Sequence, residues 1–202
     1  MKFAITGGIG SGKSTVCKIF NELGIDTFDS DYYAKQLYFL PDIKEKVIDI
    51  IGTDSILTNN EIDPKKLSSF CFNDDIIRNK IVETISDGIF KKYYEFHNNS
   101  KSPYTLFESA IILNTDRYKR FDKLIGVVSD DELRIDRVMK RSNHTREEVI
   151  KRMNTQISNN EIVQKCQFVI QNRWGLNRLK SQVNDIHSII IGNIKNGRYG
   201  YK

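Results

Sequence analysis

A stretch near the amino terminus combines glycines, a lysine and two hydroxyl side chains, residue types that together suit phosphate chemistry. It reads Gly7-Gly8-Ile9-Gly10-Ser11-Gly12-Lys13-Ser14-Thr15 and fits the pattern G-x-x-x-x-G-K-[ST] of a P-loop. Glycines let the backbone turn sharply and bring its N–H groups against phosphate oxygens. We expect Lys13 to reach the β- and γ-phosphates of a nucleotide, and the Ser14 hydroxyl to ligate Mg²⁺.

The flanking residues supply the elements that a P-loop requires. An apolar run, Phe3-Ala4-Ile5, precedes the stretch and predicts a strand. After it, apolar residues recur at i, i+3, i+4 and i+7, which predicts a helix that Gly24 ends. These apolar residues are Val16, Ile19, Phe20 and Leu23. The predicted strand and helix on either side strengthen the match to a P-loop. The alternative is a glycine-rich strand-to-helix turn with a solvated lysine, and we do not favour it.

Further apolar runs predict four more strands, separated by segments with helical patterns. They lie at residues 25–28, 104–107, 124–128 and 168–170. Consecutive strands joined through helices predict a parallel sheet with right-handed crossovers.

Two carboxylates follow the predicted second strand, in Asp29-Ser30-Asp31. One interpretation is helix capping, which Asp and Ser do well. The other places a carboxylate at the carboxyl edge of a parallel sheet, where ligands bind and where it could accept a proton from a substrate hydroxyl. The sequence leaves both open, because one Asp can cap while the other catalyses.

The segment from Pro41 to about His97 reads as helical, and Asp63-Pro64 predicts an N-cap followed by proline at the first helical position. An insertion of this length after the second strand suggests a lobe that binds a phosphoryl acceptor. Glu108, near the end of the third strand, could hold the Mg²⁺ shell through water.

Two capping boxes, Ser129…Glu132 and Thr145…Glu148, predict two further helices. Arginines at positions 134, 137 and 141 share a face of the first, and Arg152 and Gln156 share a face of the second. A solvated basic surface is one explanation. After the fourth strand of a P-loop fold, a lid that closes over ATP and supplies cations to the γ-phosphoryl is the interpretation we favour.

Composition and charge limit the classes of partner and the compartment that we expect for this chain. The 202 residues hold 31 Lys and Arg against 26 Asp and Glu, a formal net charge of +5 that suits nucleotide phosphates. It would also suit nucleic acid, but the basic residues are dispersed and no recognition motif occurs. The sequence contains no run of 18 apolar residues, so we expect no membrane span. The P-loop strand starts immediately, which suggests no signal peptide, and we therefore expect a cytoplasmic protein. We expect Cys17, Cys71 and Cys166 to be reduced.

In this order the motifs resemble those of the dephospho-CoA kinase family, and the similarity runs nearly end to end. The resemblance is carried by the segments Ile5–Thr15, Phe28–Asp31 with Ala34–Leu37, Arg137–Arg141 with Arg152 and Gln156, and Phe168–Asn172. It implies an α/β fold: a five-stranded parallel sheet with helices on both faces, an inserted helical acceptor domain and a helical lid.

The resemblance also implies a reaction, transfer of the ATP γ-phosphoryl to the ribose 3′-hydroxyl of dephospho-CoA, the last step of coenzyme A biosynthesis. It implies Mg²⁺ as the cofactor, ATP and dephospho-CoA as the partners, and no obligate protein partner, nucleic acid or membrane. By resemblance Asp31 accepts the hydroxyl proton and Asn172 lies near the adenine. We expect Lys13 to hold the β- and γ-phosphates and Arg137 and Arg141 to neutralise charge on the transferring phosphoryl. The P-loop residues 8–15 bind the nucleotide, and Ser14 holds the metal.

Read with the resemblance, the sequence predicts a nucleotide-binding core (1–35, 102–130 and 166–195), an acceptor domain (36–101), a lid (131–165) and a loose tail (196–202). Two alternatives remain at this stage, another small-molecule or nucleotide P-loop kinase and a non-catalytic nucleotide- or nucleic-acid-binding protein. The chain departs from the family pattern at Pro64, Asp87, Gly88, Asn114, Ser142 and Gln167. Most of these positions lie away from the predicted phosphate-binding residues. We therefore expect the contacts with the acceptor to differ from the family pattern more than the contacts with ATP do.

Overall fold

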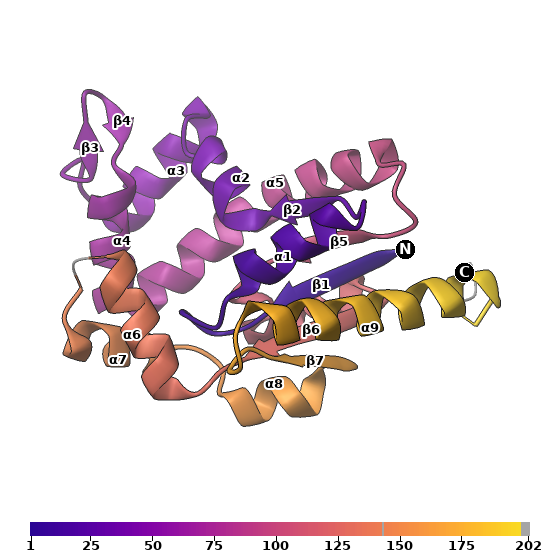
Figure 1. Cartoon of the computed structure of the whole chain (residues 1–202). Coiled ribbons are helices and arrows are strands. Elements are labelled where there is room, and N and C mark those ends of the chain that lie inside the picture. Colours follow the sequence, from indigo (N-terminus) through magenta and orange to yellow (C-terminus); the bar gives the residue numbers. More distant parts are fainter. Residues whose placement is uncertain (143, 199–202) are drawn as a thin grey trace. The chain divides into compact units, whose positions relative to one another are not determined.

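The computed structural model describes residues 1–142 and 144–198 and divides the chain into two compact units (Figure 1). The first joins Met1–Phe28 with the chain from Ser100 onward, and the second is Asp29–Asn99. Residues 199–202 of the predicted tail lie outside the described part. None of the described helices has the length and apolarity that a bilayer crossing needs.

The first unit is built on a five-stranded parallel sheet, as predicted, and β1 lies at its centre. The strands are β1 (Lys2–Thr6), β2 (Thr27–Asp29), β5 (Thr105–Glu108), β6 (Lys123–Val128) and β7 (Phe168–Gln171), in the order β2-β5-β1-β6-β7. Because the strands are parallel, their carboxyl ends meet at one edge of the sheet. The P-loop, Glu108 and Asn172 all follow or end strands at that edge.

Helices cover both faces of this sheet. The helices of the first unit are α1 (Lys13–Glu22), α6 (Asp131–Arg141), α7 (Arg146–Asn154), α8 (Asn159–Lys165) and α9 (Leu176–Lys195), with short 3₁₀ turns at Ile112–Asn114 and Asp116–Arg120. Apolar residues of α1 and α9 form one core with Phe3 and Ile125. Successive residues of a strand lie on opposite faces of the sheet, so Gly126 lies on the face opposite to Ile125. There it packs against Ile162 of α8.

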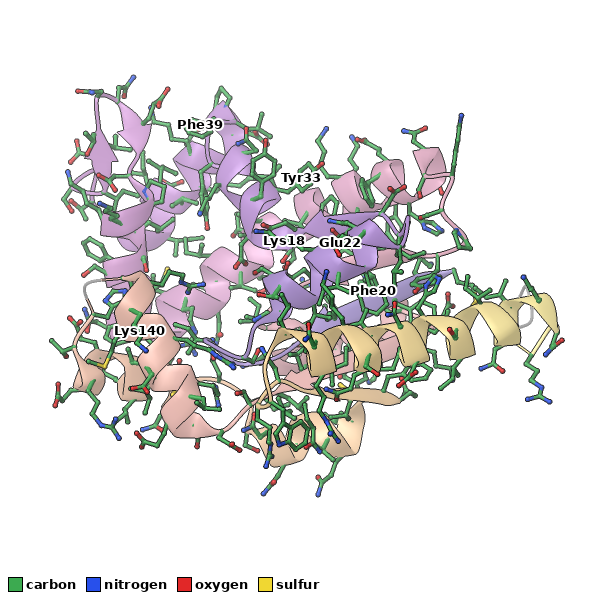
Figure 2. All side chains as sticks on the ribbon, in the orientation of Figure 1. Lys18, Phe20, Glu22, Tyr33, Phe39 and Lys140 are labelled. Atoms are coloured by element: carbon green, nitrogen blue, oxygen red, sulfur yellow. The ribbon has the colours of Figure 1, made fainter. Side chains whose placement is uncertain are left out.

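The buried and exposed sides of α1 follow from the periodicity seen in the sequence. Figure 2 labels three of its residues: Phe20 is fully buried, whereas Lys18 and Glu22 are exposed. Glu22 forms an ion pair with Lys180 of α9, with 2.9 Å between Oε2 and Nζ. Gly24 follows the helix with a φ of 78°, in the left-handed region predicted for a residue that ends a helix.

The second unit is helical apart from one hairpin. It holds α2 (Ser30–Leu37), α3 (Pro41–Ile51), β3 (Leu57–Thr58), β4 (Glu61–Ile62), α4 (Pro64–Asn73) and α5 (Asp75–Asn99). The prediction of a wholly helical segment is wrong at β3 and β4, which pair antiparallel. Asn59 and Asn60 form the turn with φ of 52° and 62°, a left-handed pair that Asn tolerates and that matches the twist of a hairpin.

The helix N-caps agree with the predicted capping residues at two helices and differ from them at others. Asp63 caps α4, since its Oδ1 accepts from the Lys65 amide at 2.8 Å, and Thr145 forms its capping box with Glu148, as predicted. The predicted box at Ser129 is wrong, because α6 starts after Asp130 without a side-chain cap. Ser129 Oγ donates instead to the Asn172 carbonyl at 2.7 Å. A box that was not predicted, Ser158 with Glu161, starts α8.

Gly88 has a packing role in the middle of α5. A Cβ built on Gly88 would lie 2.9 Å from Cδ1 of Leu37, a buried residue of α2. This distance is shorter than a normal carbon–carbon contact, so a side chain at position 88 would require the Leu37 side chain to move. Glycine at this position lets Leu37 pack directly against α5.

The close approach of α8 to the sheet gives a stability prediction at Gly126. In Gly126→Ala the new Cβ would lie 2.5 Å from Ile162 Cγ2 and 3.1 Å from Cys166 Sγ. Overpacking of this kind costs about 1–3 kcal/mol, and we expect that loss in the free energy of unfolding measured with urea. Combining Gly126→Ala with Ile162→Leu removes the Cγ2 methyl and should recover part of it.

Gly192→Ala is the matched control. Gly192 lies within α9, and a Cβ there meets nothing within 4 Å. Replacing a helical glycine by alanine in open space stabilises by about 0.5–1 kcal/mol. Equal stability for Gly126→Ala and Gly192→Ala would contradict the packing described for α8.

Candidate active site

The P-loop connects the carboxyl end of β1 to the start of α1, as its pattern predicts. Gly10 and Gly12 have φ of 76° and 95°, in the left-handed region that favours glycine. A Cβ on Gly12 would also lie 2.2 Å from Nδ2 of Asn172. Conformation and crowding both require glycine at this position.

Backbone amides of the loop are available to bind an anion. The amides of Gly10, Gly12 and Ser14 make no hydrogen bond to another residue within the described ranges. They precede or begin α1, whose amino-terminal end carries a partial positive charge. The Lys13 ammonium donates to the Gly7 carbonyl at 2.7 Å and so lies over the loop. The arrangement suits phosphate groups.

An oxygen pair lies at the start of α1. Ser14 Oγ donates to Glu108 Oε1 at 3.0 Å, and Glu108 is the last residue of β5, beside β1 in the sheet. A hydroxyl and a carboxylate at this spacing match the oxygen ligands that Mg²⁺ prefers, with nucleotide phosphates and waters completing the shell. The residues present therefore fit a magnesium ion held together with a nucleotide.

Asn172 and Arg137 join the P-loop to α6. The Asn172 side-chain amide donates to the Ser11 carbonyl at 2.8 Å, and its backbone carbonyl accepts from Arg137 Nη2 at 3.0 Å. Arg137 Nη1 also donates to Ser129 Oγ at 3.1 Å and to the Gly10 carbonyl at 3.4 Å. The structure thus brings Arg137 and Asn172, both predicted site residues, against the phosphate-binding loop.

The three arginines of α6 share a side of the helix but not an environment. Arg137 is half-buried, and Arg141, at the last turn, is exposed. Arg134 is only 4 % exposed, and its Nη1 pairs with Asp131 Oδ1 at 2.9 Å. Burial lowers the pKa of the Arg134 guanidinium, partly offset by Asp131, although the group stays charged at any physiological pH.

Sequence reasoning missed the contacts on Ile9. Its amide donates to Gln156 Oε1 at 2.7 Å, and its carbonyl accepts from Arg134 Nε at 3.0 Å. Both partners were noticed as members of basic or polar helix faces, but helical spacing gives no sign of which backbone group a side chain reaches. They also line a cavity of about 480 Å³ together with Met153 and Asn159.

The two carboxylates at the end of β2 and just after it take different positions. Asp29 Oδ1 accepts from the amides of Asp31 at 2.9 Å and Tyr32 at 3.0 Å, so Asp29 is the N-cap of α2. Asp31 lies in the first turn of that helix and is exposed. Capping is thus done by Asp29, and the carboxylate of Asp31 is not used for it.

Comparison with known proteins identifies the family to which this chain is similar. The family model described as dephospho-CoA kinase matches residues 1–177. A dephospho-CoA kinase of Fusobacterium nucleatum is 31% identical over 183 residues, which cover 91% of this chain and 95% of that protein. One from Legionella pneumophila is 31% identical over 184 residues, with 91% and 92% covered.

Solved structures show the same fold. A dephospho-CoA kinase from Campylobacter jejuni superposes with a TM-score of 0.66 at 25% identity, covering 96% of this chain and all of that one. A Thermus thermophilus protein, TT1252, reaches 0.81 at 22% identity, with 95% and 97% covered. A shikimate kinase from Acinetobacter baumannii reaches 0.55 at 14% identity, which shows a shared kinase fold alone.

The family model covers most of the chain, and its relatives are matched over nearly their whole length. The chain therefore belongs to the dephospho-CoA kinase family, ATP-dependent kinases of coenzyme A biosynthesis.

Proposed function

We propose that this chain transfers the γ-phosphoryl of ATP to the ribose 3′-hydroxyl of dephospho-CoA, with the roles below for its own residues. The observation that carries the proposal is the complete P-loop. Its amides at Gly10, Gly12 and Ser14 donate to no other residue in the part of the chain that the structure describes, and the Lys13 ammonium lies over the loop. In phosphoryl transfer the protein has little covalent work to do, so positioning and charge stabilisation supply most of the rate.

At the phosphate end, the loop amides and Lys13 bind the β- and γ-phosphates. Ser14 and Glu108 hold the metal shell, and Mg²⁺ when bound offsets charge on those phosphates. Arg137, fixed by Ser129 and Asn172, places a cation beside the Gly10 end of the loop. Arg141, exposed at the end of α6, supplies a second cation on lid closure.

At the acceptor end, Asp31 orients the hydroxyl and takes its proton. Support comes from the division of labour after β2, since Asp29 already satisfies the amides at the start of α2. Asp31 itself lies two residues beyond a strand that ends at the carboxyl edge of the sheet, where ligands bind in parallel α/β folds.

The function is tested by ADP release in a coupled assay with Mg²⁺ and ATP, with and without dephospho-CoA. Adenosine, AMP and shikimate serve as comparison acceptors. We expect stimulation by dephospho-CoA and little by the others. Stimulation by a different acceptor would leave the kinase chemistry in place and overturn the substrate.

The role of Asp31 gives a prediction with a matched control. Asp31→Asn should lower turnover at least about a hundredfold, the usual loss when a positioned general base is removed. Asp29→Asn should stay within about threefold of the parent enzyme, because Asn caps helices as well as Asp does. Lys13→Ala should lose at least as much as Asp31→Asn. Equal turnover of the two Asp→Asn variants would refute the assignment of the base.

The Ser14–Glu108 pair predicts a change in metal dependence. Glu108→Gln removes the carboxylate charge but keeps the size, and should raise the Mg²⁺ concentration for half-maximal activity about tenfold. At saturating Mg²⁺ the rate should recover in part. Glu45→Gln, an exposed position on α3, is the control and should leave the Mg²⁺ titration unchanged. An unchanged titration for Glu108→Gln would remove Glu108 from the metal site.

A further inference from the structure

Ile9 is held at three points by residues that follow β6. Its amide donates to Gln156 Oε1 at 2.7 Å, and its carbonyl accepts from Arg134 Nε at 3.0 Å. Its side chain packs against a small core formed by Ile135 and Val138 of α6 and Val149 of α7. Few degrees of freedom remain for this residue, although it occupies a variable position of the P-loop pattern.

The two hydrogen bonds act on two different peptide groups. The Ile9 amide belongs to the peptide that joins it to Gly8, and the Ile9 carbonyl belongs to the peptide that joins it to Gly10. In a trans peptide the C=O and N–H groups point in opposite directions. Because Arg134 draws the Ile9 carbonyl to one side, the Gly10 amide is turned to the other. That amide is one of the donors available to phosphate.

The absence of a side chain at Gly8 makes room for the two residues that hold Ile9. Gly8 does not have a positive φ, so its backbone conformation does not call for glycine. A Cβ there would lie 2.1 Å from Arg134 Nη2 and 3.3 Å from Gln156 Oε1. The missing side chain leaves the space in which the buried guanidinium and the carboxamide reach Ile9.

We propose that Arg134 and Gln156 are positioning residues for phosphoryl transfer, which fix both peptide groups of Ile9 and thereby direct the Gly10 amide toward the nucleotide. The sequence places both residues on the faces of a predicted lid and assigns this role to neither of them. The proposal rests on the function proposed above only in that the bound nucleotide is ATP, since the geometry itself concerns the loop and not the acceptor.

The first test uses Gln156→Leu in the full chain, with Gln164→Leu as the control because Gln164 is an exposed residue of α8. In Gln156→Leu the Ile9 amide should exchange with solvent about tenfold faster, while β1 amides keep their rates, as expected when one hydrogen bond is lost. Affinity for an unhydrolysed ATP analogue, followed by the fluorescence of Trp174, the single tryptophan, should fall about tenfold. Turnover with dephospho-CoA should fall by a similar factor.

Urea unfolding of Gln156→Leu and Gln164→Leu establishes that both variants are fully folded under the assay conditions, which separates positioning from general unfolding. Unchanged exchange at Ile9, or faster exchange with unchanged nucleotide affinity and turnover, would overturn the proposal. Failure to phosphorylate dephospho-CoA in the parent chain would concern the proposed substrate alone. The exchange and nucleotide-binding results would still decide the role of Gln156.

The second test addresses Arg134 through Gly8. Gly8→Ala displaces the guanidinium without removing any hydrogen-bonding group, and Arg134→Lys shortens the side chain while keeping its charge. Each should lower nucleotide affinity severalfold, and the double variant should lose clearly less than the product of the two factors. Losses that multiply would show that Gly8 does not serve Arg134, and would overturn that half of the proposal.

Discussion

The carbonyl groups of the P-loop are held from outside, and the direction of its amides depends on this. Arg134 holds the carbonyl of Ile9, Arg137 that of Gly10, and Asn172 that of Ser11. Each fixed carbonyl turns the amide of the following residue the opposite way. The Ser11 amide then donates within the loop to the Gly8 carbonyl at 3.1 Å, while the Gly10 and Gly12 amides are directed as donors for a ligand. Fixing these groups in advance lowers the cost of ordering the loop on binding.

The contacts behind the loop also explain why several of its positions are glycine. Glycines at positions 10 and 12 meet the left-handed backbone, but crowding acts there as well: a Cβ on Gly10 would lie 2.5 Å from the Arg134 carbonyl. On Gly7 it would lie 2.4 Å from the Val127 carbonyl of β6. The P-loop is thus shaped by what packs behind it as much as by the phosphate that it binds.

Most of the fold could be predicted from the sequence because its signals are local. Apolar runs marked the five strands, and the spacing of Val16, Ile19 and Phe20 marked α1. The hairpin of β3 and β4 was missed because its strands are only two residues long, too short for any periodicity. The Asn59-Asn60 pair was its one available sign.

The site was predictable where the chemistry has a fixed spacing, as in Lys13 and Ser14, and less so where long side chains reach across the fold. Gln156 contacts a backbone group 147 positions earlier in the chain, and Arg134 one 125 positions earlier. Nothing in a helical pattern reveals such partners. The role of Ser129 shows the same limit, since the S-x-x-E pattern favoured a cap while the hydroxyl bonds to Asn172.

The packing of Gly88 against Leu37 limits which side chains α5 can carry at this position. A Cβ at position 88 would lie 2.9 Å from Leu37 Cδ1, so the Leu37 side chain would have to adopt another rotamer to admit it. Leu37 is buried, and its neighbours limit that movement. How well alanine is accepted at position 88 therefore measures the rotamer freedom left at the contact between α2 and α5.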